Sequence, residues 1–149
     1  SVLHAQTFAQ HPVMCAAGLA AMRYICKHRL VERAAAMGKI LHERLETLRG
    51  HACVGDVRGR GLLAGVEFVA DKAAKRPFPR AARFSETFAE TAQAMGLVVW
   101  ENHAQADGVN GDLAMLAPPF VISESEIEQL VVLFKQALDA TVRKVSAKA

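Results

Sequence analysis

The chain has 149 residues, of which 52% are hydrophobic and 22% are charged, close to the averages of one globular domain. These values exclude a disordered chain, a collagen-like repeat and a disulfide-dense scaffold. Eighteen Lys and Arg against fifteen Asp and Glu leave a net charge of +3, too small and too evenly spread to predict a surface for nucleic acid or for an anionic membrane.

The first expected element is a helix that begins at Pro12, because a proline in the first turn of a helix costs no hydrogen bond. Small and apolar residues cover nearly all of its sides: Val13, Ala16, Ala17, Ala20, Met22 and Ile25. Such a helix is normally buried on most sides. We therefore expect it to pack against protein outside this chain, and we expect the isolated chain to be oligomeric.

Next come an amphipathic helix and two strands. Apolar residues at spacings of three and four predict a helix that ends at Gly50: Leu30, Ala34, Met37, Leu41, Leu45 and Leu48. Residues 52–57 and 62–69 are short β-prone runs, with Gly59 and Gly61 at the join. They predict two strands connected by a turn.

The last part of the chain predicts two helices and two more strands. Phe84, Phe88, Thr91 and Met95 mark one helix, and residues 97–100 and 113–117 read as strands around a polar loop, 101–112. Ser123 with Glu126 forms a capping-box pattern at the start of the final helix. The fold class is therefore α+β: a small, mostly antiparallel or mixed sheet of about four short strands covered by long helices.

The spacing of the cysteines and the lengths of the apolar runs predict a cytoplasmic protein. Cys15, Cys26 and Cys53 form no C-x-x-C motif, as expected for reduced thiols of a cytoplasmic protein. No apolar run approaches the ~18–20 residues that a membrane span requires. Because the sequence starts at Ser1 rather than at a methionine, we expect a piece of a longer protein.

Few residues suggest chemistry by themselves. His11 and Cys15 have the helical spacing of metal ligands but no further ligand nearby, so we expect no metal site. The run 58–61, Arg-Gly-Arg-Gly, reads as a tight turn with exposed or paired arginines rather than a phosphate cradle. Asp112 is expected to hydrogen-bond within its own loop. No lysine of this sequence lies in the apolar setting that Schiff-base chemistry needs.

Four segments taken together are more specific. The first reads HAQTFAQHPVMCAA (4–17), and the second reads VGDVRGRGL (54–62) followed by GVEFV (65–69). The third combines DG (107–108) and GD (111–112) with LAPPF (116–120), and the fourth joins Ile122 to EI (126–127). In this order they resemble the C-terminal part of class III (fold type I) pyridoxal-phosphate-dependent aminotransferases, over nearly the whole chain.

The resemblance implies a division of the chain and one cofactor contact. Residues 1–29 correspond to the end of a large-domain segment and the start of an interdomain helix, and residues 30–149 to the C-terminal small domain. Thr7 matches the threonine that binds the cofactor phosphate of the opposite subunit, which implies a homodimer or higher homo-oligomer. The Schiff-base lysine, the aspartate on the pyridine nitrogen and the stacking aromatic residue are expected upstream of this chain.

Three positions depart from the family pattern. Gln10 replaces a glycine beside Thr7. Ornithine-type members carry an arginine where this chain has Met115, and amine-pyruvate members carry a carboxylate-binding arginine near the position of Trp100. Because neither side chain supplies a guanidinium, a substrate carboxylate must be held elsewhere.

Two classes of function are weighed. The first is a segment of a transaminase that moves an amino group from an amine or amino acid to a keto acid, with an aminomutase or decarboxylase of the same fold as a variant. The second is a non-catalytic α+β binding or interaction domain, which the missing catalytic lysine favours.

Overall fold

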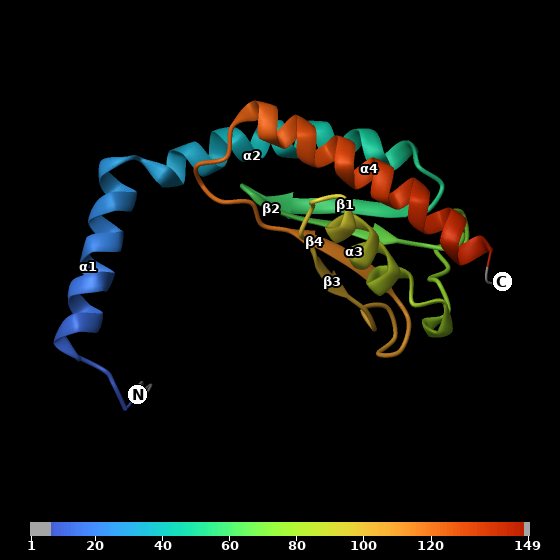
Figure 1. The fold of residues 1–149 in the computed structure, drawn as a ribbon, viewed down its shortest axis with the longest axis horizontal. Coiled ribbons are helices and arrows are strands. Elements are labelled where there is room, and N and C mark those ends of the chain that lie inside the picture. The colour runs from blue at the N-terminus through green and yellow to red at the C-terminus, as the bar shows by residue number, and fades with distance from the viewer. Residues whose placement is uncertain (1–6, 148–149) are drawn as a thin grey trace.

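The computed structural model describes residues 7–147. Helix α1 (Pro12–Lys27) begins at the expected proline and buries none of its residues. It projects from the rest of the molecule, with the N-terminal end of the chain at its far end (Figure 1). His28 and Arg29, the latter with a left-handed φ of 49°, separate it from α2 (Leu30–Glu46).

Helix α2 confirms the predicted apolar pattern. It continues as a 3₁₀ turn, Thr47–Gly50, so that the helical segment ends at the expected glycine. Its buried face consists of Leu30, Met37, Leu41, Leu45 and, in the 3₁₀ turn, Leu48. This spacing places one side of the helix against the sheet.

The sheet has four antiparallel strands in the order β1-β2-β4-β3. They are β1 (Val54–Arg60), β2 (Leu63–Phe68), β3 (Trp100–Asn102) and β4 (Asp112–Leu116). Two sequence predictions are wrong in detail. Arg58 and Arg60 lie in β1 rather than in a turn, because both pair with β2, and β3 begins at Trp100 because pairing with β4 starts only there.

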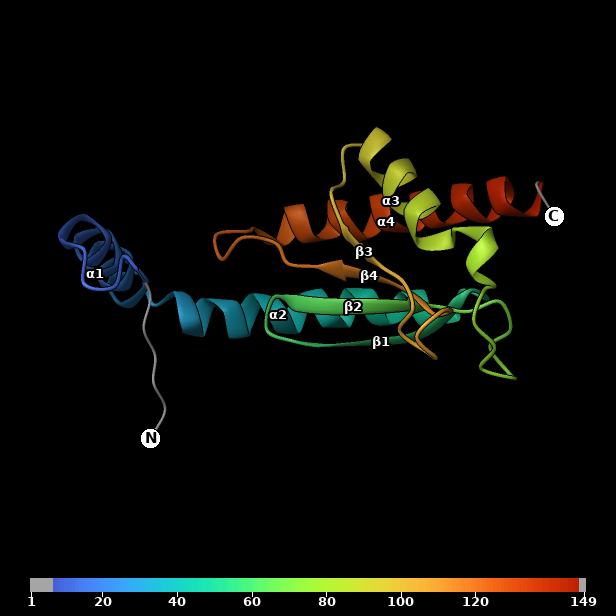
Figure 2. The same ribbon diagram turned by 90° about the horizontal axis from the view of Figure 1, so that it is seen from below.

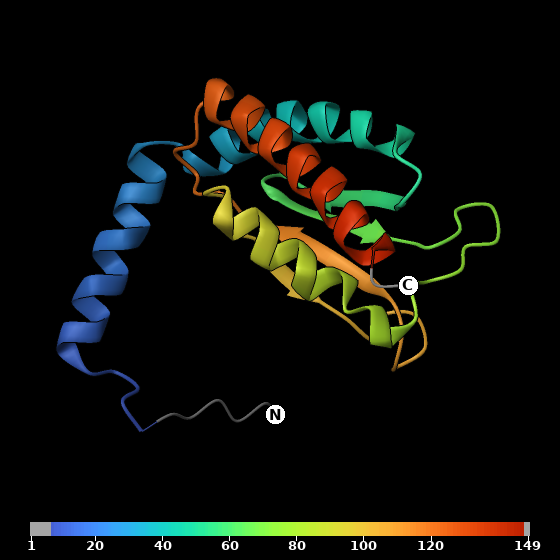
Figure 3. The ribbon, with the colours of Figure 1, turned by 45° about the vertical axis from the view of Figure 1, so that its right-hand side comes forward.

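The helices cover one face of the sheet. Helix α3 (Phe84–Ala94) follows a short 3₁₀ helix, Arg80–Ala82, and α4 (Glu124–Ser146) starts with the predicted capping box between Ser123 and Glu126. Figure 3 shows α4 between α2 and α3 above the sheet. Within residues 7–147 no helix covers the opposite face, which Figure 2 shows with α2 behind β1 and β2.

An aromatic cluster fills the space between this sheet and the helices. The ring of Phe68 lies 5.1 Å from that of Phe84 and 5.0 Å from that of Phe88, and Phe88 lies 4.7 Å from Phe134. All four side chains are fully buried. Tilted aromatic pairs at these distances stabilise a core beyond their buried area. The α+β fold class is confirmed.

Candidate functional site

Thr7 is exposed in a turn that leads into α1. The N–H of His11 donates to the carbonyl of Phe8 across this turn at 3.2 Å. Gln10 adopts a left-handed φ of 66°, so the turn forms although glycine is absent. Within residues 7–147 no side chain caps the first turn of α1, and Thr7 is therefore not its cap. Positions 4–6 of the same motif lie outside the described residues.

A pocket of about 590 Å³ lies beside the β1–β2 turn. Two motifs of the sequence meet there, the RGRGL run and the LAPPF run, together with Ala34 of α2. Arg60 pairs with Leu63 across a two-residue connection, in which Gly61 has a positive φ of 56°. Glycine favours such tight hairpin turns because it has no Cβ. Segments distant in the sequence therefore build one recess.

Two glycines allow α2 and this hairpin to touch. A Cβ built on Gly38 would lie 2.3 Å from the carbonyl carbon and oxygen of Gly61, and one on Gly59 would lie 2.7 Å from the imidazole of His42 in α2. A real Cβ cannot approach so closely. The helix therefore packs directly on the backbone of the turn, which fixes one wall of the pocket.

Arg33 fixes another wall. Its Nε donates to the carbonyl of Phe120 at 2.9 Å, and its Nη2 donates to the carbonyls of Val121 and Ile122 at 3.2 and 2.7 Å. These bonds tie α2 to the segment that follows β4. A fork of fixed N–H donors suits several adjacent carbonyl groups, so the segment after Pro119 has a defined path.

The open face of the sheet continues beyond the pocket. Trp100 is the cross-strand partner of Met115, and the indole is 67% exposed. With Val98, which is 80% exposed, they border a shallow hollow of about 370 Å³. Trp100 and Met115, the two apolar positions noted above as departures from the family pattern, are thus adjacent.

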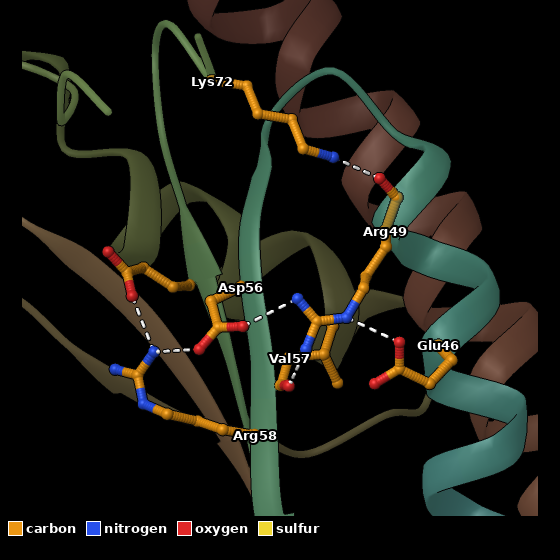
Figure 4. A network of polar contacts seen from close by, with 7 residues as sticks. Glu46, Arg49, Asp56, Val57, Arg58 and Lys72 are labelled. Atoms are coloured by element: carbon orange, nitrogen blue, oxygen red, sulfur yellow. Dashed lines mark hydrogen bonds and ion pairs between the residues drawn. The ribbon is translucent and has the colours of Figure 1, made fainter. Parts of the chain in front are cut away.

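On the other half of the open face, Asp56, Arg58 and Glu67 form a charged network with Arg49 (Figure 4). Arg58 donates to Asp56 at 3.0 Å and to Glu67 at 2.6 Å, while Arg49 donates to Asp56 at 2.7 Å and to the carbonyl of Val57. Burial acts to raise the pKa of Asp56, but the hydrogen bonds from Arg58 and Arg49 outweigh it and lower that pKa. This network ties β1 to the end of the second helix.

Asp112 corrects a prediction. It was expected to bond within its own loop, but its Oδ1 accepts the backbone N–H of Ser85 at 3.1 Å, at the start of α3. The loop is organised instead by Asp107, which accepts the N–H groups of Val109 and Asn110 at 2.8 and 2.6 Å. Asp112 is only 4% exposed, so it links β4 to α3 from inside.

The described lysines lie at the surface or in polar contacts. Lys135 pairs with Asp139 at 2.9 Å, Lys144 donates to Thr91 at 2.8 Å, and Lys72 donates to the carbonyl of Arg49. Among residues 7–147 no three His, Cys, Asp or Glu side chains gather as metal ligands, so His11 and Cys15 gain no third partner. No helix in this part of the chain is long and apolar enough to span a bilayer.

Sequence patterns missed the parts that shape the pocket. Arg33 lies on an amphipathic helix where an exposed arginine is ordinary, and its carbonyl partners are 87 to 89 residues away. Gly38 interrupts a helical pattern, and an isolated glycine inside a helix is a known sign of close packing. That signal was available in the sequence.

Comparisons with known proteins agree with this architecture. The family model for aminotransferase class III matches residues 1–138. The chain is 33% identical to the uncharacterized aminotransferase YodT of Bacillus subtilis, over 97% of this chain and 33% of YodT. It is 39% identical to the uncharacterized aminotransferase C1771.03c of Schizosaccharomyces pombe, over 91% of this chain and 30% of that protein. The solved structure of a thermostable omega transaminase mutant from Pseudomonas jessenii matches with a TM-score of 0.83 and 33% identity, over 97% and 30%. The chain thus spans about a third of the length of its relatives.

Proposed function

The chain belongs to the class III aminotransferase family, and on this premise we propose that it forms the C-terminal part of a pyridoxal-phosphate-dependent transaminase. That enzyme moves an amino group from an amine or amino acid to a keto acid. The observation that carries the proposal is the family match over residues 1–138, which includes every element up to most of α4. The match covers 33% of the length of YodT, which supports the assignment of this chain to one part of a longer enzyme.

Residues 30–149 are proposed to be the small domain, and residues 1–29 the end of a large-domain segment with the start of an interdomain helix. The packing supports this boundary. Leu30 is the first buried residue among those described, whereas α1 buries none of its side chains. A helix with exposed Val13, Met14 and Met22 suits a place between two bodies of protein.

Thr7 fits the edge of the cofactor. It carries a hydroxyl donor, it is exposed, and the first turn of α1 beside it has no side-chain cap within the described residues. Unpaired N–H groups at a helix start, together with a hydroxyl, favour a phosphate dianion. When bound, pyridoxal phosphate supplies an electron sink for the carbon that bears the amino group.

The chain's own part in the reaction is therefore binding, because Thr7 holds the phosphate across the homodimer interface. None of the described lysines stands in an apolar pocket, so the lysine that bonds to the cofactor is proposed to lie in the polypeptide that precedes Ser1. We also propose a cytoplasmic location, which the three free cysteines support.

The experiment starts from the coding region upstream of Ser1. The encoded polypeptide is expressed with and without that region, incubated with pyridoxal phosphate, and assayed with an amine donor and pyruvate. We expect amino transfer, and a borohydride-stable label on one lysine, only in the longer polypeptide. Such a label on a lysine of residues 1–149 contradicts the assignment. If the upstream region encodes no apolar strand followed by a lysine, and the longer polypeptide binds no cofactor, the chain is a non-catalytic binding domain instead.

A further inference from the structure

The pocket beside the β1–β2 turn has walls that other contacts hold in place. Arg33 binds the carbonyl groups that follow Pro119, and the contact between Gly38 and Gly61 supports the turn. Two prolines restrict the backbone on the remaining side. The volume of about 590 Å³ lies in the range of small-molecule sites. A ligand would meet a preformed, open recess and would spend little binding free energy on ordering it.

Arg60 lines this pocket without a partner. Its guanidinium makes no hydrogen bond or ion pair with any side chain or backbone group of residues 7–147, whereas Arg58, in the same strand, is paired with Asp56 and Glu67. Arg60 is exposed and lies opposite Leu63 on the open face. The remaining lining is apolar or backbone: Ala34, Gly61, Leu62, Leu63, Ala117, Pro118, Pro119 and Phe120.

One unneutralised guanidinium beside an apolar wall selects a ligand class. The planar N–H fork of arginine matches the two oxygens of a carboxylate, and the wall favours a hydrocarbon body. We propose that this pocket binds a small organic carboxylate, with the carboxylate on Arg60 and the apolar body against residues 117–120. The proposal goes beyond the transaminase assignment and does not depend on it, because it concerns binding by this chain alone.

The test uses hexanoate as the probe, with hexan-1-ol and hexylammonium as neutral and cationic matches. The chain is labelled with ¹³C at alanine and leucine methyl groups, and Ala34, Leu62, Leu63 and Ala117 report on the pocket. Hexanoate is expected to shift these signals to saturation. Hexan-1-ol should bind at least about tenfold more weakly because it lacks charge-assisted hydrogen bonds, and hexylammonium should be repelled by Arg60.

Two variants and a control separate the charge from the cavity. Arg60→Gln should weaken hexanoate binding about tenfold to a hundredfold and leave hexan-1-ol binding unchanged. Ala34→Leu, which fills the pocket from α2 and keeps Arg60, should weaken both ligands. The control is Arg23→Gln, which removes the same charge from an exposed position of α1 and should change nothing.

Several results would overturn the proposal. The first is a hexanoate titration of the unmodified chain that does not saturate. The second is a set of signal shifts confined to methyl groups away from the pocket. The third is an equal loss of hexanoate affinity in Arg60→Gln and Arg23→Gln. The methyl spectrum of each variant without ligand shows whether it is folded. If Arg60→Gln does not fold, the Ala34→Leu variant decides: when it is folded and binds hexanoate as well as the unmodified chain does, the proposal is also overturned.

Discussion

Gly38 and Gly61 bring helix α2 and the β1–β2 turn together until their backbones touch. At the residue scale, this contact and the three bonds from Arg33 set the form of the candidate site. The ionisable groups nearby mostly neutralise one another, as Arg58 does with Asp56 and Glu67. Single substitutions at backbone contacts should therefore change the site more than charge reversals on the sheet.

Gly38→Ala tests the backbone contact. The added Cβ would meet the carbonyl group of Gly61 at 2.3 Å, so the turn must move, and overpacking of this kind costs about 1–3 kcal/mol. We expect a lower urea midpoint with an unchanged slope. Gly18→Ala is the matched control, because its Cβ meets nothing within 4 Å. Equal midpoints for the two variants would show that the contact does not matter.

Thr7→Ala tests the phosphate contact in the longer polypeptide. Loss of one hydrogen bond to a charged group costs about 1.5–3 kcal/mol, so the dissociation constant of the cofactor should rise about tenfold to a hundredfold. The melting temperature of the apo-protein is measured on the same variant. An unchanged dissociation constant with a lowered melting temperature would assign Thr7 a structural role only.

At the scale of elements, the first turn of helix α3 is stabilised by two contacts from residues outside the helix. Asp112 of β4 accepts the N–H of Ser85 from inside the protein, and Arg80 of the preceding 3₁₀ helix is paired with Glu86 from outside. The N-cap residue, Arg83, makes no side-chain cap bond. The start of α3 thus depends on neighbours rather than on its own cap.

Asp112→Ala should remove the internal support of α3. The N–H of Ser85 is then buried without its acceptor, which costs about 1–3 kcal/mol. Asp112→Asn retains an acceptor oxygen and should recover most of the unfolding free energy in a urea titration. If Asn is no better than Ala, the hydrogen bond to Ser85 is not what stabilises this junction.

The ion pair between Arg80 and Glu86 makes the stability of the fold depend on pH. Burial acts to raise the pKa of Glu86, but the hydrogen bonds from Arg80, from the Glu86 backbone and from Ser85, together with the positive charge of Arg80, outweigh it and hold the pKa below the usual 4.5. A lowered folded-state pKa stabilises the fold above the unfolded-state value, and this stabilisation is lost as pH falls through the folded-state value.

Glu86→Gln should therefore reduce the free energy of unfolding at pH 7, and its difference from the unmodified chain should shrink below about pH 4.5. Unfolding in urea at a series of pH values measures both curves. Glu43→Gln, which alters a side chain that is 63% exposed, should change stability little at any pH. A constant deficit for Glu86→Gln would contradict the assignment to Arg80.

Elements were predictable where one segment contains its own signal. The spacing of Leu41 and Leu45 reports the buried face of α2, and Ser123 with Glu126 reports the start of α4. Strand ends were less predictable, because β3 begins where a partner is available rather than where residues 97–100 are most apolar. The pocket could not be predicted, because it joins α2 to residues near Phe120.

At the scale of the whole molecule, the chain consists of a packed body and one projecting helix (Figure 1). The body has its own aromatic core, whereas α1 exposes large apolar side chains, such as Met14 at 65% and Met22 at 58%. The uncovered sheet face adds Trp100 and Val98 to this apolar surface. Such a distribution is typical of a part that is completed by further protein.

The isolated chain should therefore self-associate through α1. Sedimentation equilibrium is expected to show dimers or larger species, and the double variant Met14→Glu, Met22→Glu should shift the equilibrium toward monomers without unfolding the body. Glu43→Gln serves as a surface control. A monomer at high concentration for the unmodified chain would contradict this expectation.

The sheet order also has a consequence for synthesis on the ribosome. Strand β2 lies between β1, which precedes it directly, and β4, which follows only after α3 and β3. The β1–β2 hairpin can form as soon as it leaves the exit tunnel, but the second edge of β2 stays unpaired until β4 emerges, and Phe68 lacks its contact with Phe134 until α4 follows. A nascent chain paused before β4 would present an unpaired edge, which makes this interval the one in which a chaperone has most to protect.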